Sequence, residues 1–229
     1  MIETTIKDDL KKVEEGLARN QLFTGLEDFY LKGIISRGEV RTWPAGTQII
    51  TEGDPGDAVF FIISGRVKVT LYGEEGREIV LAILNDGDMF GEMSIIDDKP
   101  RSANVEAVQD LQCLVVTKSA FLDYMSRHHK VYMRFFAYLT GRLREATRKI
   151  GGLALLDVCG RIAHTLMGMA KAKADGADRD VIEIERPTHE QLAAMIGSSR
   201  EVVSRALKKM TQEGYIKIEK DRILLYISE

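Results

Sequence analysis

The chain has 229 residues, with 32 basic and 35 acidic side chains and a formal net charge of −3. This length predicts one large or two small domains, and this charge argues against a protein that coats nucleic acid without selectivity. With no run of 18 apolar residues and a charged start, the sequence predicts neither a membrane span nor a signal peptide, and therefore a cytoplasmic protein. Two cysteines and four scattered histidines predict no metal, no iron–sulfur cluster and no disulfide framework.

Charge is distributed unevenly along the chain. Residues 1–120 hold 13 basic and 21 acidic side chains, residues 121–152 hold 7 and 2, and residues 153–229 hold 12 of each. A local basic footprint, not the total charge, decides whether a protein can bind DNA. The small overall charge therefore does not exclude DNA binding.

Glycines punctuate the chain between about residues 40 and 118, and short β-rich runs lie between them. Four such runs are Val59–Ile63, Val67–Leu71, Ile79–Leu84 and Leu111–Val116. Strands at this spacing, separated by turn residues, are typical of a small sandwich or barrel.

A candidate binding site for a small molecule follows at residues 90–105. Gly91 lets a backbone N–H approach an anion, and a short helix from Glu92 would aim its first amides the same way. Arg101 offers a planar fork for a phosphate, and Ser102 offers a hydroxyl. Glu92 suits a sugar hydroxyl, so the pattern favours a phosphate joined to a sugar. The alternative is a Glu92–Arg101 salt bridge inside a turn.

Residues 121–150 change to a helical pattern. Six apolar residues recur at intervals of 4, 3, 4, 3 and 4, namely Tyr132, Phe136, Leu139, Leu143, Ala146 and Ile150. This heptad seam favours a parallel dimer, because a palindromic operator demands a two-fold axis. The alternative is a helix packed on its own domain. Gly151 and Gly152 are predicted to break the helix as a hinge, before a further helix over 153–172.

A helix-turn-helix is predicted next, after an acidic loop at 175–180 and a strand over 181–185. Thr188 and Gln191 have the spacing of a capping box that starts the first helix. Gly197 permits the positive φ of a sharp turn, and Ser198 with Glu201 is read as a second capping box. The alternative is an ordinary helical hairpin with a solvated charged face.

The second helix of this motif separates apolar from polar side chains. Its predicted buried side holds Val203, Ala206, Leu207 and Met210, and its exposed side holds Arg200, Glu201, Ser204, Arg205 and Lys208. Arg200 and Arg205 can each bind guanine O6 and N7, and Glu201 can accept from a cytosine amino group. Phosphate contacts are assigned to His189, Ser199 and Lys208.

Two short strands are predicted after this helix, over 215–219 and 222–227, with Lys220 and Asp221 as the turn between them. They form a hairpin wing. The C-terminal region is therefore predicted to be a winged helix-turn-helix.

These motifs, in this order, resemble those of the CRP/FNR family of bacterial transcription regulators, and most of all its cyclic-AMP-receptor branch. The resemblance covers nearly the whole chain and rests on residues 52–65, 91–105, 153–163 and 199–205. It implies an α+β fold in three parts. These are a cyclic-nucleotide-binding β-roll of jelly-roll type in 1–120, a dimerisation helix and hinge in 121–152, and the winged helix-turn-helix in 153–229.

The resemblance also implies a ligand and its contacts. The implied ligand-binding residues are Gly91, Glu92, Met93, Arg101, Ser102, Ala103 and Thr147. Among them, Gly91, Arg101 and Ser102 would hold a cyclic phosphate, Ala103 would line the same turn, and Glu92 would take the ribose 2′-hydroxyl. Thr147 keeps one of two family hydroxyls that meet the adenine, whereas Ala146 lacks the other. Cyclic AMP is the implied ligand, with cyclic GMP, cyclic di-GMP or no ligand as alternatives.

For DNA, the resemblance implies a TGTGA-like half-site read by Arg200, Glu201 and Arg205. Ser204 beside Arg205 is also similar to the oxygen-sensing branch, whose cysteine cluster this chain lacks. The implied partners are double-stranded DNA, a second copy of the chain, and RNA polymerase through the loop at 175–180. No nucleophile–base pair predicts an enzyme. A nucleotide-binding regulatory subunit that acts by protein contact is the remaining alternative.

Overall fold

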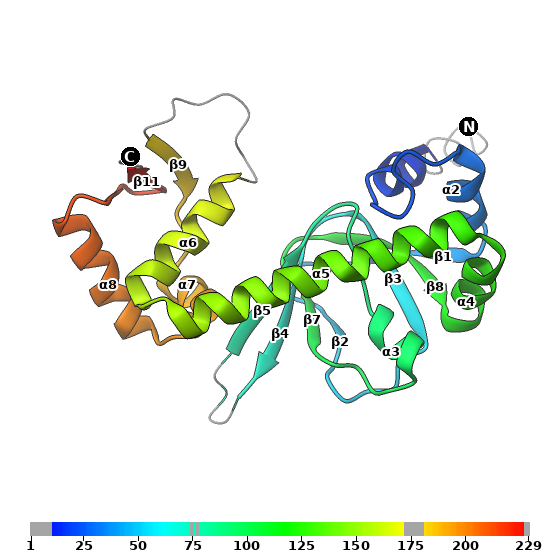
Figure 1. Ribbon diagram of the computed structural model, residues 1–229, viewed down its shortest axis with the longest axis horizontal. Coiled ribbons are helices and arrows are strands. Elements are labelled where there is room, and N and C mark those ends of the chain that lie inside the picture. The colour runs from blue at the N-terminus through cyan, green and yellow to red at the C-terminus, as the bar shows by residue number, and fades with distance from the viewer. Residues whose placement is uncertain (1–10, 74–75, 77, 172–180, 227–229) are drawn as a thin grey trace. The chain divides into compact units, whose positions relative to one another are not determined.

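The structure is a computed structural model of the chain (Figure 1). It describes residues 11–73, 76, 78–171 and 181–226. These form two compact units: the first comprises Met1–Leu71 and Leu81–Arg144, the second Tyr72–Val80 and Glu145–Glu229. The predicted division into 1–120, 121–152 and 153–229 stays a prediction of domain organisation.

The β-roll consists of two four-stranded sheets. The first sheet has the strand order β1 (Gly38–Trp43), β8 (Leu111–Thr117), β3 (Ala58–Ser64) and β6 (Met89–Phe90). The second has the order β2 (Gln48–Ile50), β7 (Asn104–Ala107), β4 (Val67–Tyr72) and β5 (Glu78–Leu84). All four runs predicted as strands are strands, so the predicted sandwich-like β-roll is confirmed.

Strand β3 shows why its sequence is almost entirely apolar. Successive side chains of a strand point to opposite faces of the sheet. Val59, Phe61 and Ile63 enter a buried cluster that includes residues of the helices. Phe60 and Ile62 enter a different cluster, formed by residues from both sheets. Because both faces of β3 are covered, both sets of side chains must be apolar.

Helices supply the rest of the first cluster. Residues 11–18 are helical, and they are followed by α2 (Asp28–Ile35), α4 (Lys118–Arg127) and α5 (His129–Leu155). A short helix, α3 (Glu92–Asp97), lies between β6 and β7. Helix α5 buries Val131, Phe135 and Tyr138, a row spaced by four and three residues, in this cluster.

The predicted heptad seam lies on a different side of α5 from this buried row. Leu143 is 67% exposed and Ile150 is 65% exposed, and Tyr132 and Phe136 are also exposed. Only Leu139 of the seam packs against the cluster. Packing on the chain's own core therefore uses a different row, and dimerisation through the seam stays a prediction.

The predicted break of the helix at Gly151 and Gly152 is wrong, because α5 continues through both glycines to Leu155, and a hinge at this position stays a prediction. The next helix, α6 (Val158–Lys171), starts later than the predicted Leu153. A glycine inside a helix costs only about 1 kcal/mol, which neighbouring helix formers can offset. The helix instead ends near Asp157, whose carboxylate accepts the Gly160 N–H at 2.7 Å, as helix-starting side chains do. Ala172 lies outside the described residues.

The second unit contains α6, α7 (His189–Ile196) and α8 (Arg200–Gln212), with a three-stranded sheet in the order β10 (Ile216–Ile218), β11 (Arg222–Tyr226) and β9 (Val181–Glu185). The two predicted wing strands pair antiparallel, and the predicted strand over 181–185 joins them as β9. The helices and the sheet share one buried cluster. The winged helix-turn-helix and the α+β class are therefore confirmed. Residues 175–180 and Ile227 lie outside the described residues.

Candidate functional site

Gly91 begins the candidate nucleotide site with a left-handed backbone, at φ 81° and ψ 8°, directly before α3. A Cβ atom at this position would lie 2.7 Å from Arg101 Nη1 and 3.2 Å from the Ala58 carbonyl oxygen. Both the φ angle and the close approach therefore require glycine. The predicted short helix from Glu92 is confirmed.

Arg101 is only 6% exposed, and its guanidinium is held from one side. Nη1 donates to the Gly91 carbonyl at 2.7 Å and to Ser94 Oγ at 2.9 Å, and Nη2 donates to the Ala58 carbonyl at 2.9 Å. The guanidinium also lies 5.8 Å from the centre of the Phe60 ring. A guanidinium has five N–H groups. These three bonds leave the Nε–H and one Nη2–H for a ligand.

Glu92 is 5% exposed, and its carboxyl is the second polar group of the site. Burial raises the pKa of this carboxyl, while the positive charges of Arg142 and Arg101 and a hydrogen bond from its own backbone N–H oppose the rise. Within the part of the chain that the structure describes, Arg101 bonds to backbone carbonyls and Ser94 and forms no ion pair with Glu92. The alternative of a Glu92–Arg101 salt bridge is therefore not what the structure shows.

Sequence reasoning missed two residues of α5 that act on this site. The positive charge of Arg142 opposes the rise that burial causes in the pKa of the Glu92 carboxyl. Its Nη1 donates to the hydroxyl of Tyr138 at 3.0 Å, and Tyr138 in turn donates to the Met89 carbonyl at 2.9 Å. The only signal in the sequence was that Arg142 follows Tyr138 by four residues on one helix side.

The other predicted ligand residues are placed as follows. Ala103 is buried. Ser102 is exposed, and its hydroxyl donates to the sulfur of the exposed Met93 at 3.5 Å. Thr147 lies on α5 in the second unit, and its contact with a ligand stays a prediction. The structure thus brings together Gly91, Glu92 and Arg101, and their chemistry fits a phosphate joined to a hydroxyl-bearing group.

The helix-turn-helix starts as predicted. The Gln191 N–H donates to Thr188 Oγ1 at 3.1 Å, and the Thr188 N–H donates to Gln191 Oε1 at 2.8 Å, which completes the capping box. Gly197 ends α7 with φ 62° and ψ 48°. The Ser198 N–H then donates back to the Ala193 carbonyl at 3.0 Å. The predicted sharp turn is confirmed.

The second predicted capping box, between Ser198 and Glu201, is wrong. Ser199 is the residue that caps α8, and its Oγ accepts the Val202 N–H at 3.3 Å. Because the Ser198 N–H already closes the end of α7, the extended backbone of a cap falls one residue later. Hydrogen bonds from its own backbone N–H and from Ser199 lower the pKa of Glu201.

The exposed side of α8 carries the predicted DNA contacts. All four predicted apolar residues of α8 are buried: Val203, Ala206, Leu207 and Met210. An open depression of about 490 Å³ is lined by Arg200, Glu201, Ser204 and Arg205. Lys208 is exposed further along α8, and His189 is half-buried in the first turn of α7. Hydrogen-bonding side chains on an exposed helix can reach base edges in a major groove.

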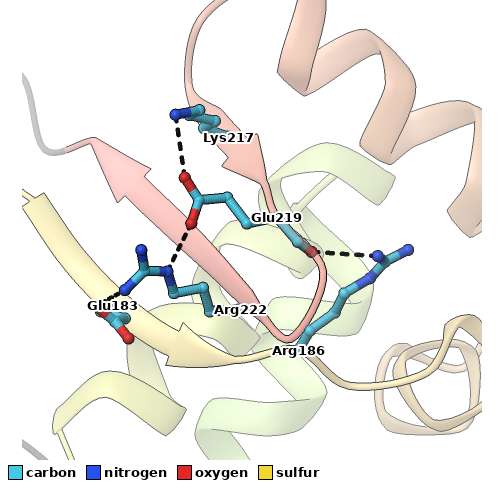
Figure 2. A network of polar contacts seen from close by, with 5 residues as sticks. All are labelled: Glu183, Arg186, Lys217, Glu219 and Arg222. Carbon is cyan, nitrogen blue, oxygen red and sulfur yellow. Dashed lines mark hydrogen bonds and ion pairs between the residues drawn. The ribbon is translucent and has the colours of Figure 1, made fainter.

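The charged side chains of the wing, in contrast, are paired with one another (Figure 2). Glu219 accepts from Arg222 Nε at 2.6 Å and forms an ion pair with Lys217 at 3.0 Å. Arg222 also reaches Glu183 at 3.0 Å, and Arg186 donates to the Glu219 carbonyl at 3.3 Å. Lys217 and Arg222 on the wing are therefore largely neutralised by neighbouring carboxylates.

Two features are absent from the residues that the structure describes. No helix in this part of the chain is long and apolar enough to cross a membrane. No group of three or more histidine, cysteine, aspartate or glutamate side chains among the same residues could hold a metal ion.

Comparisons with known proteins match two regions of the chain. The family model of the cyclic nucleotide-binding domain matches residues 40–128, and that of the Crp-like helix-turn-helix domain matches residues 160–227. The CRP-like cAMP-activated global transcriptional regulator of Mycobacterium tuberculosis is 30% identical over 220 residues, which is 95% of this chain and 97% of the relative.

Solved structures agree on the fold. The catabolite activator protein of Thermus thermophilus is 30% identical with a TM-score of 0.55, over 90% of this chain and 93% of that one. The c-di-GMP responsive global regulator CLP of Xanthomonas campestris has a TM-score of 0.78 over 88% of this chain and all of its own, and at 24% identity it shows the fold alone.

A cyclic-nucleotide-binding domain followed by a Crp-like helix-turn-helix defines a non-enzymatic transcription regulator that binds cyclic nucleotide and DNA. The chain belongs to the CRP/FNR family of such regulators.

Proposed function

We propose that this protein is a dimeric regulator that binds cyclic AMP and, in response, a palindromic TGTGA-like operator. The observation that carries the proposal is the buried Arg101, whose three hydrogen bonds leave two N–H groups for a ligand in the same cassette as the buried Glu92 carboxyl. The name of the Mycobacterium tuberculosis relative, a cAMP-activated regulator at 30% identity, supports the same ligand.

The pocket residues contact different parts of the ligand. Arg101 and the backbone around Gly91 hold the cyclic phosphate, since a guanidinium fork matches two phosphate oxygens. Ser102 adds a hydroxyl, with Met93 and Ala103 beside it. Glu92 accepts the ribose 2′-hydroxyl. Thr147 meets the purine, and the missing hydroxyl at Ala146 makes the base the weakest-held part of the ligand.

The exposed seam of α5 supports a dimer. Leu143 and Ile150 are about two-thirds exposed in the single chain, at 67% and 65%, although they repeat with heptad spacing. A second copy that covers this row would remove apolar surface from water and provide the two-fold axis of a palindrome. Two recognition helices would then enter major grooves about 34 Å apart.

On DNA, Arg200 and Arg205 read guanines and Glu201 reads a cytosine amino group, while Ser204 lies next to the outer base of the half-site. His189, Ser199 and Lys208 contact phosphates and set the register without reading sequence. Cyclic AMP favours the DNA-binding state only through its higher affinity for that state. The loop at 175–180 contacts RNA polymerase.

Calorimetry with three ligands tests the pocket. We expect the chain to bind cyclic AMP more tightly than cyclic di-GMP, because one cyclic phosphate and one ribose hydroxyl match Arg101 and Glu92. The proposed contact of Thr147 with the purine should also favour cyclic AMP over cyclic GMP, by a smaller factor. Preference for cyclic di-GMP, the ligand in the name of the Xanthomonas campestris protein, would replace this assignment. No binding of any of the three would refute a nucleotide response.

Selection of binding sites from random duplex DNA, with and without cyclic AMP, tests the proposed DNA-binding response. The expected result is enrichment of a palindrome with TGA cores only when cyclic AMP is present. Failure to enrich any sequence would favour the regulatory subunit that acts by protein contact. Sedimentation should show a dimer, and a monomer in both states would contradict the seam.

A further inference from the structure

Tyr138 is a buried tyrosine that connects α5 to the strand preceding the nucleotide site. Its side chain is 5% exposed, and its hydroxyl donates to the Met89 carbonyl at 2.9 Å. Met89 belongs to β6, the strand that ends at Phe90, directly before Gly91. Burial raises the pKa of Tyr138 to about 12, although Arg142 opposes this, so the hydroxyl stays protonated and able to donate.

The same hydroxyl also holds Arg142. Arg142 Nη1 donates to Tyr138 Oη at 3.0 Å, and the guanidinium lies 5.9 Å from the centre of the Tyr138 ring. Arg142 follows Tyr138 by four positions on α5, so both contacts form along one helix side. A flexible arginine is thereby fixed at two points.

The position of Arg142 matters because of Glu92. A carboxylate as deeply buried as Glu92 is costly when ionised unless positive charge faces it. Arg142 and Arg101 both lower the pKa of Glu92, and the hydrogen bonds from Arg142 to Tyr138 and from Tyr138 to Met89 tie Arg142 to the strand that leads into Glu92. Arg101, moreover, is bonded to Gly91, Ser94 and Ala58, so Arg142 is the cation that can move most if its support is removed.

We propose that Tyr138 is a positioning residue for nucleotide selectivity: it fixes Arg142 so that Glu92 is held as an acceptor for the ribose 2′-hydroxyl. This inference rests on the proposed cyclic-nucleotide response of the site. It adds a residue of α5 that contacts no ligand but decides how strongly a ribonucleotide is preferred over its 2′-deoxy analogue.

Substitution Tyr138→Phe tests this role, because it keeps the ring and removes only the hydroxyl. Cyclic AMP and 2′-deoxy cyclic AMP are titrated into the full chain by calorimetry. We expect Tyr138→Phe to weaken cyclic AMP binding about tenfold, as for one hydrogen bond to a charged group, and to change the deoxy analogue by less than about twofold. The preference for the ribonucleotide should therefore collapse.

Tyr124→Phe is the matched control. Tyr124 is also a buried tyrosine of the first unit whose hydroxyl donates to a backbone carbonyl, that of Tyr30, at 2.5 Å. Its loss should leave the ratio of the two nucleotide affinities unchanged. Arg142→Lys alters the other partner of the Tyr138–Arg142 hydrogen bond and should also lower the ratio of cyclic AMP affinity to 2′-deoxy cyclic AMP affinity. The double variant should lose no more than the larger single loss, because the two residues act as one unit.

Each outcome is decisive. Equal weakening of both nucleotides by Tyr138→Phe would make Tyr138 a structural residue only and overturn the inference while leaving the proposed function intact. If Tyr138→Phe does not fold, an unchanged ratio in Arg142→Lys overturns it. If the wild-type chain binds no cyclic nucleotide, the proposed function itself fails, and that result is separable from the other two.

Discussion

The nucleotide pocket and the recognition helix use arginine in opposite ways. In the pocket, Arg101 is buried and already satisfied on one side by Gly91, Ser94 and Ala58. On α8, Arg200 and Arg205 are exposed, and the ion pair between Arg200 and Glu190 is a loose 3.7 Å. One site holds its cation in place before the ligand arrives. The other leaves its cations free to adjust to a base edge.

This difference predicts that the two sites respond differently to substitution. A buried, preoriented guanidinium loses little side-chain entropy on binding, so each remaining N–H contributes more to affinity. An exposed arginine must be ordered at the interface, and salt screens its charge. The pocket should therefore be sensitive to any single substitution, and the recognition helix should lose affinity in smaller steps.

Arg101→Ala should have the largest effect. It removes two charge-assisted bonds to the phosphate, and we expect cyclic AMP binding to fall by at least about 100-fold in calorimetry. Arg41→Ala is the control, since Arg41 is an exposed arginine of β1 paired with Glu39 at 2.9 Å. Thermal unfolding verifies that both variants fold. Affinity within about threefold of the wild type would remove Arg101 from the site.

Arg205→Ala should weaken binding to a selected operator by about tenfold for each half-site, because one bidentate base contact is lost. Binding to random DNA should change little and remain salt-sensitive. Lys209→Ala is the matched control on α8, where Lys209 pairs with Glu213 at 3.9 Å. Electrophoretic titration at two salt concentrations measures both. An equal loss on specific and random DNA would show that Arg205 contacts only phosphate.

The recognition helix could be predicted from sequence because its signals are local. Thr188 with Gln191, and Gly197 four residues after Ala193, determine the start and the turn within ten residues of chain. The error, a cap at Ser198 instead of Ser199, is a one-residue shift. Its cause is the hydrogen bond that Ser198 donates back to α7, which the cap spacing alone does not reveal.

The nucleotide site could be predicted only in part. Gly91, Glu92 and Arg101 lie in one cassette and were assigned together. Arg142 and Tyr138 come from a helix about fifty residues away and are found only when the fold brings α5 against β6. Likewise, a helix break was wrongly predicted at Gly151 and Gly152, because composition says nothing of how well the flanking turns support a helix.

Glu92→Gln tests the cost of the buried charge. Burial holds the folded pKa above the ordinary 4.5, although Arg142 and Arg101 oppose it. Between pH 4.5 and the raised pKa, the carboxyl keeps a proton in the folded protein that it has lost in the unfolded protein. The stability that Glu92 contributes in its protonated form therefore disappears as pH rises through this range. Without ligand, the variant should therefore gain stability relative to the wild type as pH is raised through this range. Its cyclic AMP affinity should be about tenfold lower.

Urea unfolding at several pH values measures the difference in free energy between Glu92→Gln and the wild type. Glu39→Gln, an exposed carboxyl of the same unit, is the control and should show no such trend. A difference that stays constant with pH would mean that the two arginines fully offset the burial of Glu92. The buried charge of Glu92 would then lower the free energy of unfolding no more than the exposed charges of the recognition helix do.

Glu219→Gln should have the smallest effect, and it tests whether the wing could become a second basic surface. Glu219 accepts from Arg222 at 2.6 Å and pairs with Lys217 at 3.0 Å, and these contacts lower its pKa (Figure 2). Exposed ion pairs contribute little to stability, so the unfolding midpoint should hardly move. With Glu219 replaced, Lys217 loses its ion pair and Arg222 keeps only the one with Glu183, so affinity for random DNA should rise about two- to threefold and its salt dependence should steepen.

Glu213→Gln, at the end of α8, is the matched control because it also frees one lysine, Lys209, without touching the wing. If both variants steepen the salt dependence equally, the gain comes from net charge alone. A larger change for Glu219→Gln means that the wing lies near phosphates, where its paired cations have been limiting non-specific binding. Specificity would then depend on neutralised charge at the wing as much as on free charge at Arg200 and Arg205, because every non-specific contact removed raises the ratio of operator to random binding.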